Sequence, residues 1–308
     1  MSRATRVLVT GAGGQVGVDV VDVLNGVTPW GGDVSFQPDV VPVGDHEFEV
    51  LGLTHHELDV TDRDAVLKSL SATRPNVVVH LAAYTAVDRA EGDVDTCFAV
   101  NEHGTANMSW ASREVGAHLI AISTDYVFDG KKGAAYVEDD EPHPLNVYGA
   151  SKRAGELTCA SEDSLIRTSW VMGVRGKNVV HTIADRAASG ADVRFVNDQR
   201  GTVTASSDLA RALVPFVRER PGGLWHVANS GATTWWDIAA YVGTLLGRDE
   251  TFATPIESRE LAAFQVATRP TRSDLNTDKF ASRWTALPEW HDAVERLIND
   301  RRHLEQTA

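Results

Sequence analysis

Cysteine is scarce in this chain of 308 residues, which contains only Cys97 and Cys159. Two cysteines cannot build a disulfide framework, and no close pair of Cys and His spacings indicates a zinc site, so we predict reduced thiols and no bound metal. Long apolar runs are also missing, since none approaches the roughly 18 residues of a membrane span. The segment 1–6 is too short and too polar for a signal peptide. We therefore expect a cytoplasmic protein without a membrane partner.

Positive charge is in deficit as well. Lys and Arg total 29 against 43 Asp and Glu, which gives a formal net charge of −14. Such a protein repels a polyanion at long range, and this excludes a general nucleic-acid binder. A small anionic ligand held in a local basic pocket remains compatible with the charge. The other composition values, 43% hydrophobic and 23% charged, are ordinary for a soluble globular protein of about two domains.

Segments with strand and helix patterns alternate along the first half of the chain. Residues 6–10 are short, β-branched and followed at once by glycines, as is typical of a buried parallel strand that ends in a tight turn. Further strands are predicted at 47–53, 76–81, 118–123 and 164–168, with helices at 16–24, 62–70, 95–115 and 148–160. This alternation predicts an α/β fold with a Rossmann-like, doubly wound parallel sheet.

The alternation loosens after about residue 170. Short strands are predicted at 193–196 and 224–228, and helices at 208–218, 236–246 and 289–301. We interpret residues 1–170, together with segments of about 191–230, as a dinucleotide-binding domain, and residues 171–308 as a smaller, mixed C-terminal substrate lobe. Such a lobe would cover the carboxyl ends of the strands, where ligands of open α/β sheets bind. Residues 26–45, rich in Gly, Pro and Asp, are predicted to be a loop insertion.

A glycine-rich turn follows the first predicted strand. Gly11, Gly14 and Gly17 have the spacing GxxGxxG, and the next helix carries Gln15 and Val16 in its first turn. Glycine allows a tight turn, close approach of a pyrophosphate to the backbone and close packing of the helix on the sheet. The amino end of the helix adds unpaired N–H groups for the phosphates. The turn therefore predicts a dinucleotide site.

The tip of the second predicted strand bears on the choice of cofactor. A carboxylate at this position would bind a ribose 2′-hydroxyl, but the strand is followed by Thr54-His55-His56. A 2′-phosphate would not be repelled there, so the sequence favours NADPH and leaves NADH open. Asp59, beside Val60, is a candidate to meet the adenine amino group, and it is equally a candidate N-cap for the next helix.

Tyr148 and Lys152 are four residues apart and share one face of a predicted helix. A free tyrosine has a pKa of about 10 and is a poor acid or base at neutral pH. A cation one helical turn away stabilises the phenolate, so we expect Lys152 to lower the pKa of Tyr148. Thr124 stands at the carboxyl end of the strand 118–123, where its hydroxyl can bind a substrate carbonyl beside Tyr148. We predict that these three residues form a catalytic set.

These motifs resemble those of extended short-chain dehydrogenases/reductases and, more narrowly, those of the dTDP-4-dehydrorhamnose reductase family. The most specific matching blocks are 123–130 and 167–171. Further matches lie at 10–17, 82–88, 100–101 with 104–105, 144–156, 198–199 with 201, and 269–270 with 273. The resemblance implies NADPH-dependent reduction of the 4-keto group of a dTDP-6-deoxy-4-keto-hexose, with dTDP-4-dehydro-L-rhamnose as the expected substrate and dTDP-L-rhamnose as the product.

The resemblance also implies roles for individual residues. The catalytic residues would be Thr124, Tyr148, Lys152 and Asn101, the last supporting the lysine through water. The cofactor would be lined by Gly11, Gly14, Gln15, Val16, Gly17, Asp59, Val60, Ala82, Ala83, Tyr84, Tyr148 and Lys152. The substrate would contact Thr124, Asp125, Tyr126, Tyr148, Trp170 and Arg269, the arginine near its pyrophosphate. A homodimer is a family-level expectation, and some members hold Mg²⁺ at a dimer contact, although no such ligands map onto this chain.

Departures from the family pattern fall on the predicted substrate side. Met172 stands where an aromatic residue is common, 201–204 reads Gly-Thr-Val-Thr in place of Gly-x-Pro-Thr, and Ala205 replaces another common aromatic. These departures bear on the identity of the sugar more than on the chemistry. Three alternatives are open: a 4-ketoreductase for another deoxysugar nucleotide, a nucleotide-sugar epimerase, and a non-catalytic NADP-binding regulatory subunit. A 4,6-dehydratase is disfavoured, because the triplet 124–126 reads Thr-Asp-Tyr and lacks the second carboxylic acid.

Overall fold

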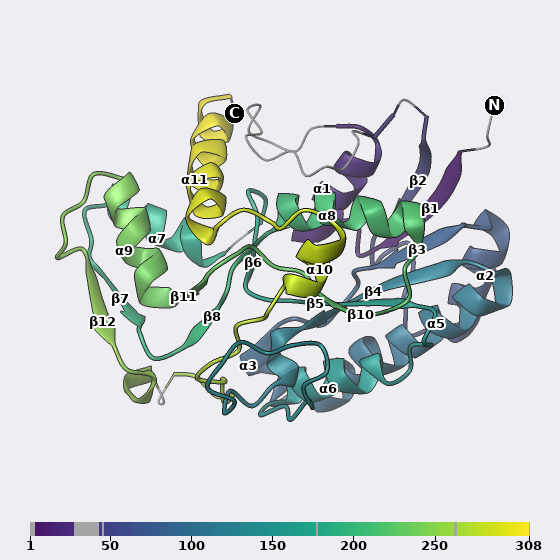
Figure 1. Ribbon diagram of the computed structural model, residues 1–308, viewed down its shortest axis with the longest axis horizontal. Coiled ribbons are helices and arrows are strands. Elements are labelled where there is room, and N and C mark those ends of the chain that lie inside the picture. Colours follow the sequence, from purple (N-terminus) through teal and green to yellow (C-terminus); the bar gives the residue numbers. More distant parts are fainter. Residues whose placement is uncertain (1–3, 28–42, 45, 177, 262–263, 308) are drawn as a thin grey trace.

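The structure of the chain is a computed structural model that describes residues 4–27, 43–44, 46–176, 178–261 and 264–307 (Figure 1). Most of the predicted insertion at 26–45 lies outside the described residues. The larger part of the molecule is built on a six-stranded sheet with the order β2-β1-β3-β4-β5-β10. Its strands are β1 (Thr5–Thr10), β2 (Phe48–Leu53), β3 (Val77–His80), β4 (His118–Thr124), β5 (Ser164–Thr168) and β10 (Gly223–His226).

Every neighbouring pair in this sheet is parallel. The chain order reverses between β1 and β3, and ligands of open parallel sheets bind at such a switch point. The carboxyl ends of β1, β3 and β4 meet at this edge of the sheet. The structure therefore confirms the predicted doubly wound parallel fold.

Helices cover both faces of the sheet, because strands buried on two sides carry apolar residues in both directions. In β1, Val7 and Val9 belong to the core under α1 (Gln15–Leu24) and α8 (Ser206–Glu219). Leu8 points the other way, into the core under α2 (Arg63–Thr73) and α5 (Gly104–Val115). In Figure 1, α1 and α8 accordingly lie above the sheet, whereas α5 and α6 (Val147–Glu156) lie below it.

The helix predicted at 95–115 is interrupted in the structure. It consists of α4 (Val94–Phe98), a π-helical turn η1 (Ala99–His103) and α5. Wide turns of this kind shift the side chains that follow, and they are frequent at functional sites. Asn101, one of the predicted catalytic residues, lies in η1.

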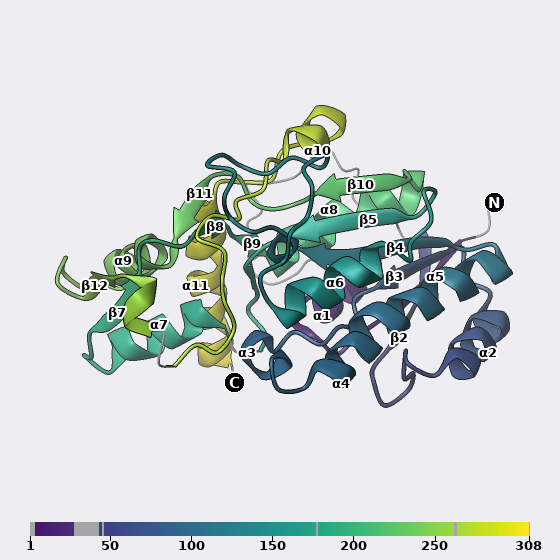
Figure 2. The ribbon, with the colours of Figure 1, turned by 90° about the horizontal axis from the view of Figure 1, so that it is seen from below.

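The C-terminal elements form a second apolar core beside the sheet, as Figures 1 and 2 show from two sides. Its main elements are α7 (Val179–Ala188), β7 (Val193–Val196), α9 (Trp235–Leu245), β12 (Ala253–Ile256) and α11 (Trp290–Thr307). Three short pairs are β7 with β12, β6 (Val171–Met172) with β9 (Thr204–Ala205), and β8 (Arg200–Thr202) with β11 (Ala232–Thr234). Within 191–230, β10 belongs to the main sheet and α8 packs beside α1, which covers one face of that sheet. The strand β7 pairs with β12 instead. The division at residue 170 stays a prediction.

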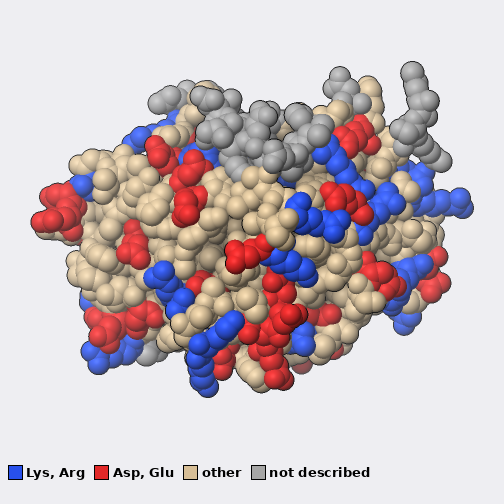
Figure 3. All heavy atoms as spheres, in the orientation of Figure 1, with Lys and Arg blue, Asp and Glu red and all other residues tan. Residues whose placement is uncertain are grey.

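The remaining elements are short. They are α3 (Val87–Ala90), η2 (Asp125–Val127), η3 (Ser258–Leu261) and α10 (Asp278–Arg283). Across the described ranges, no helix combines the length and the apolar character that crossing a membrane requires. On the face shown in Figure 3, acidic and basic side chains are intermixed.

Candidate active site

The glycine turn after β1 lies at the switch point, where β1 and β3 are neighbours. Gly11 has a φ of +67°, in the left-handed region that favours glycine. A Cβ on Gly11 would lie 2.7 Å from the backbone N of Ala82, and a Cβ on Gly17 would lie 2.2 Å from the carbonyl O of Gly11. Backbone thus packs on backbone at this turn, and side chains are excluded from it.

The amino end of α1 opens on this turn. Gly14 is the N-cap, no side chain caps the helix, and its first turn contains no acidic residue. Gly13 and Gly14 are exposed. An uncapped helix end attracts phosphate through its N–H groups and its dipole. The cradle therefore fits the pyrophosphate of a dinucleotide.

Gln15 and Val16 follow the turn but have different partners. Gln15 Nε2 donates to the carbonyl O of Val171 at 3.4 Å, which links α1 to β6. Val16 is partly buried against the main core. Both predicted cofactor residues lie at the edge of the glycine cradle.

A buried histidine holds the segment after β3 against the turn. His80 Nδ1 shares a hydrogen bond of 2.8 Å with the Thr10 hydroxyl, which also accepts from the backbone N of Ala82 at 3.4 Å. On its other side, His80 Nε2 lies 3.4 Å from the Thr105 hydroxyl. Burial lowers the pKa of His80 to about 3, so the ring is neutral. This neutral contact fixes the start of the segment from Ala82 to Tyr84, which was predicted to face the cofactor.

Asn101 connects that segment to α6. Its Oδ1 accepts from the backbone N of Tyr84 at 2.9 Å, and its Nδ2 donates to the Tyr84 carbonyl O at 3.0 Å and to Ser151 Oγ at 2.9 Å. Ala82, Ala83 and Tyr84 remain half-buried. None of the hydrogen bonds recorded for the Asn101 side chain in the described structure reaches Lys152. Its observed contacts position the cofactor-facing segment and α6 relative to each other.

Tyr148 and Lys152 lie on α6, which Asn146 caps by accepting from the backbone N of Gly149 at 2.8 Å. A Cβ on Gly149 would lie 2.1 Å from the carbonyl O of Tyr126. Glycine at this position thus lets α6 approach the turn after β4. The close approach brings Tyr148 beside Thr124.

Thr124 stands between Tyr148 and Asp125. The Thr124 hydroxyl faces Tyr148 and is the group that opposes the rise of the Tyr148 pKa. Thr124 Oγ1 accepts from the backbone N of Tyr126 at 3.2 Å and donates to Asp125 Oδ1 at 3.2 Å, while Ser273 Oγ donates to Asp125 Oδ2 at 2.5 Å. Burial raises the pKa of Asp125 to about 6, although these hydrogen bonds lower it in part. The Asp125 carboxylate, predicted to face the substrate, is 2% exposed and lies behind Thr124.

The predicted effect of Lys152 on Tyr148 is wrong for this structure. Burial raises the pKa of Tyr148 to about 12, and the group that opposes this rise is Thr124. Lys152 Nζ instead donates to the carbonyl O of Ile122 in β4 at 2.6 Å. Burial lowers the pKa of Lys152 to about 8, although the negative charge of Glu156 raises it in part. The sequence shows that the two residues share a helix face, but it does not show how deeply each is buried.

A buried ion pair anchors α6 beneath the site, and the sequence analysis missed it. Arg167 on β5 donates to both carboxylate oxygens of Glu156, at 2.8 and 2.7 Å. Ser123 Oγ donates to Glu156 Oε1 at 2.6 Å, and Arg153 donates to Glu156 Oε2 at 2.9 Å. The carboxylate thus connects α6 with β4 and β5 directly below the catalytic candidates.

Tyr126 has two other predicted site residues, Tyr148 and Arg269, as its neighbours. The rings of Tyr126 and Tyr148 meet edge to face with centroids 5.9 Å apart, and burial raises the pKa of Tyr126. Arg269 donates to both oxygens of Asp88, at 3.0 and 2.6 Å. The hydrogen bonds from Arg269 hold the pKa of Asp88 below its usual range. Asp88 was not predicted from the sequence as a partner of this arginine.

Trp170 follows β5 in a left-handed backbone conformation, with a φ of +41°. Its ring stacks on Trp235 with centroids 4.0 Å apart and planes 16° from parallel. A Cβ on Gly201 would lie 2.6 Å from the Trp170 ring. Trp235, which the sequence analysis did not select, therefore fixes the orientation of Trp170.

At the tip of β2, the structure corrects the prediction that no carboxylate is present. Thr54 donates to Glu57 Oε2 from its backbone N and from its hydroxyl, both at 2.8 Å. A carboxylate therefore does stand at this tip, and the reason for favouring NADPH no longer holds. The sequence did contain a signal for this carboxylate, because Glu57 stands three residues after Thr54, which directly follows the strand.

Asp59 and Val60 follow that tip. Asp59 Oδ1 accepts from the backbone N and hydroxyl of Thr61, at 2.9 and 2.8 Å. The N-cap of α2 is Asp62, which accepts from Ala65 N at 2.9 Å, so Asp59 is not the helix cap. Val60 is buried in the core under α2 and α5, which leaves its backbone as the part that can meet a cofactor.

In the residues that the structure describes, no group of three or more His, Cys, Asp or Glu side chains is arranged to hold a metal ion. The site instead combines a phosphate cradle, a protonated phenol and a hydroxyl at one edge of the sheet. Such a set can bind a dinucleotide and donate a proton to a carbonyl oxygen.

A family model described as the RmlD substrate binding domain matches residues 5–303. The dTDP-4-dehydrorhamnose reductase of Sinorhizobium fredii (strain NBRC 101917 / NGR234) is 34% identical over 266 residues, or 82% of this chain and 89% of that protein. A probable dTDP-4,6-dihydroxy-2-methyloxan-3-one 4-ketoreductase of Streptomyces antibioticus is 35% identical over 303 residues, or 96% of this chain and 95% of that protein. The crystal structure of dTDP-4-dehydrorhamnose reductase from Bacillus anthracis str. Ames, in complex with NADP, is similar with a TM-score of 0.84 and 30% identity, covering 96% of this chain and 99% of its own.

Proposed function

This chain belongs to the RmlD family of dTDP-4-dehydrorhamnose reductases, and we propose that it uses NAD(P)H to reduce the 4-keto group of a dTDP-6-deoxy-4-keto-hexose. The substrate proposed first is dTDP-4-dehydro-L-rhamnose, which yields dTDP-L-rhamnose. The observation that carries the proposal is the placement of Tyr148 beside Thr124 at the carboxyl end of β4, at the same edge of the sheet as the glycine cradle.

The cofactor-binding residues proposed are those around the switch point. The backbone of Gly11 to Gly17 and the amino end of α1 would hold the pyrophosphate, and the segment from Ala82 to Tyr84 would line the nicotinamide side. The nicotinamide supplies the hydride that reduces C4. Residues 1–170 together with α8 and β10 would carry the cofactor, and the other C-terminal elements would carry the substrate.

Tyr148 is the proposed proton donor. Because burial raises the pKa of Tyr148 to about 12, its hydroxyl keeps its proton at neutral pH until an alkoxide develops at C4. Thr124, beside that hydroxyl, would turn its own hydroxyl from Asp125 to donate to the same developing oxygen. Lys152, whose Nζ already donates to the Ile122 carbonyl O, would offer its remaining N–H donors to the cofactor ribose and so hold the nicotinamide beside Tyr148. Asn101 would act by positioning α6 against Tyr84.

The proposed substrate contacts lie on the C-terminal side. The Trp170–Trp235 stack would offer a rigid aromatic face to the nucleotide. Arg269 would meet the pyrophosphate, with Asp88 orienting its guanidinium. Tyr126 would line the sugar beside Tyr148, and Asp125 would orient Thr124 from behind.

Two other functions give different observable results. An epimerase keeps its cofactor through turnover and consumes none, and a regulatory subunit binds the cofactor without turnover. The intact set of Thr124, Tyr148 and Lys152 supports an enzyme, and the relatives named as a reductase and as a probable 4-ketoreductase support net reduction.

The test mixes the purified protein with NAD(P)H and enzymatically made dTDP-4-dehydro-L-rhamnose, and follows the loss of cofactor absorbance. We expect one cofactor oxidised for each sugar reduced. Tyr148→Phe should lower kcat by about a hundredfold or more and leave the Kd of the cofactor nearly unchanged. Full activity of this variant would refute the role of Tyr148, and no oxidation with any 4-keto sugar nucleotide would move the protein to the regulatory class.

A further inference from the structure

The Glu57 carboxylate at the tip of β2 is held in place by Thr54, the residue that directly follows the strand. Both donors of Thr54 meet the same oxygen of Glu57, at 2.8 Å each. These two bonds hold the pKa of Glu57 below its usual range, so the group is ionised at neutral pH. A carboxylate has about four acceptor positions, so two bonds from Thr54 leave capacity for a further hydroxyl donor.

This tip adjoins the glycine cradle. The backbone N of Ala12 donates to the carbonyl O of Leu53 at 3.1 Å, and a Cβ on Gly13 would lie 3.3 Å from the methyl carbon of Thr54. In doubly wound folds, the residue at the end of the strand beside the cradle meets the adenine ribose. The anchored carboxylate therefore stands on the ribose side of the proposed cofactor site.

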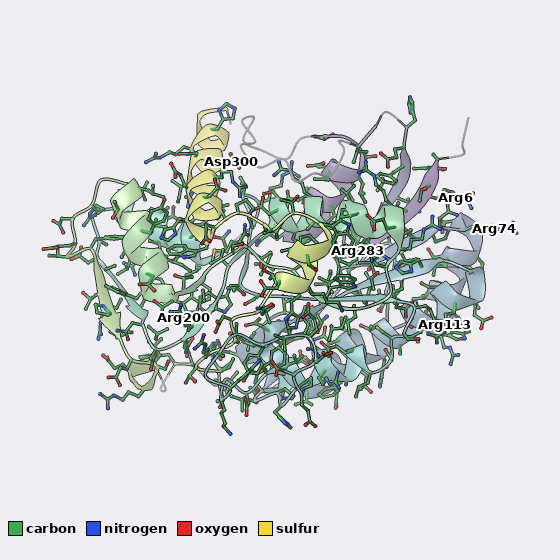
Figure 4. The ribbon with its side chains drawn as sticks, in the orientation of Figure 1. Arg6, Arg74, Arg113, Arg200, Arg283 and Asp300 are labelled. Carbon is green, nitrogen blue, oxygen red and sulfur yellow. The ribbon has the colours of Figure 1, made fainter. Side chains whose placement is uncertain are left out.

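The chain around this tip lacks the cations that bind a 2′-phosphate. No Lys or Arg occurs between Arg6 and Arg63, whereas ten Asp and Glu do. Arg6 lies at the opposite end of β1, where its Nε donates to the carbonyl O of Arg74 at 2.7 Å, and Figure 4 shows the two arginines together at that margin. The guanidinium of Arg63 stacks over the Trp110 ring, 4.0 Å from its centroid. Neither arginine that borders this stretch of sequence is available at the tip.

We propose that Glu57 makes this enzyme select NADH over NADPH, by accepting a hydrogen bond from the ribose 2′-hydroxyl and repelling a 2′-phosphate. The proposal rests on the proposed function only in that a nicotinamide dinucleotide binds at the cradle. It replaces the preference inferred from the sequence, which depended on a strand tip without a carboxylate.

The test measures binding and needs no sugar substrate. The Kd values of NADH and NADPH are determined by calorimetry for the wild type, for Glu57→Gln and for the control Glu49→Gln, which removes the same charge from an exposed position on β2. All three proteins are titrated in the same buffer at the same pH. Adenosine 2′,5′-bisphosphate and 5′-AMP serve as probes of the adenosine half alone.

We expect the wild type to bind NADH about tenfold or more tighter than NADPH, and 5′-AMP tighter than the bisphosphate. Glu57→Gln should bring the two dinucleotides to within about threefold, mainly by tightening NADPH, because a neutral amide no longer repels phosphate. Glu49→Gln should keep the wild-type ratio. Circular dichroism of each variant checks that it is folded.

Tighter binding of NADPH by the wild type, or a ratio that Glu57→Gln leaves unchanged, would overturn the role of Glu57 while leaving 4-keto reduction intact. The protein could also show the expected Kd ratios and yet oxidise no cofactor with any 4-keto sugar. That result would support the role of Glu57 and refute the proposed reductase activity. Failure to bind either dinucleotide would refute both.

Discussion

Glu156 and Arg167 form a bidentate ion pair that is almost completely shielded from water, at the carboxyl end of the helix that carries Tyr148 and Lys152. The pair joins α6 to β5, and Ser123 joins the same carboxylate to β4. The position of the proposed proton donor relative to the sheet therefore depends on a charged contact that takes no part in the chemistry.

Removing one member of this pair should destabilise the fold strongly. Arg167→Met leaves the Glu156 carboxylate buried without its main partner, and we expect the free energy of unfolding to fall by about 3–5 kcal/mol. Urea unfolding followed by circular dichroism measures the loss. The double variant Glu156→Leu with Arg167→Met buries no unpaired charge and should recover a large part of it. A single variant within about 0.5 kcal/mol of the wild type would contradict this account.

Gly149→Ala should impair catalysis through position alone. Its Cβ would lie 2.1 Å from the Tyr126 carbonyl O, so α6 must move away from the turn that holds Thr124. A displacement of about 1 Å costs about a hundredfold in rate, and we expect a loss of that size in kcat with the Kd of NADH nearly unchanged. The control is Gly92→Ala, whose Cβ would meet its nearest atom at 3.9 Å and should leave kcat near the wild-type value.

The pH dependence of kcat should report Lys152. Because burial lowers its pKa to about 8, Lys152 is a cation below that pH and loses its charge as the pH rises through it. Tyr148, with a pKa raised to about 12, keeps its proton throughout this range. We expect kcat for reduction to decline above about pH 8. In Lys152→Met the rate should be about a hundredfold lower and this decline should vanish, and a decline that persists in the variant would assign it to another group.

His80 should make stability depend on pH in the acid range. Its pKa is lowered to about 3 in the folded chain against an ordinary value of about 6.5, so the unfolded chain binds the extra proton. The stability that the neutral ring contributes is thus complete above pH 6.5 and is lost as the pH falls toward 3, by about 1.4 kcal/mol for each pH unit.

His80→Asn should be less stable than the wild type at pH 7, by about 1–3 kcal/mol for the lost contacts with Thr10 and Thr105. This difference in unfolding free energy should shrink between pH 6.5 and 5. The wild type loses stability there as its unfolded chain takes up a proton on His80, whereas the variant has no such group. Urea unfolding at pH 7, 6 and 5 measures it, with the exposed His143→Asn as the control. A constant difference at all three values would show that His80 is not buried as a neutral ring.

Patterns over a few residues were enough to predict the main elements around the site. The β-branched run before Gly11 became β1, and the alternation that follows became the parallel sheet. The helix expected at 95–115 was right in place but wrong in detail, since its π-helical turn at Asn101 has no local signature in the sequence. The Trp170–Trp235 stack joins residues 65 positions apart, and no local pattern marks such a contact.

The sequence by itself determined the glycine turn, the order of strands and helices, and the placement of Tyr148 and Lys152 on one helix face, because each depends on residues only a few positions apart. The tertiary structure decided what those residues contact and how they titrate. The partners of Lys152, Asp125 and Arg269 stand 30, 148 and 181 positions away in the chain. Burial then decided the direction of the pKa shift of Tyr148, because the exclusion of water from a side chain is a property of the packed molecule.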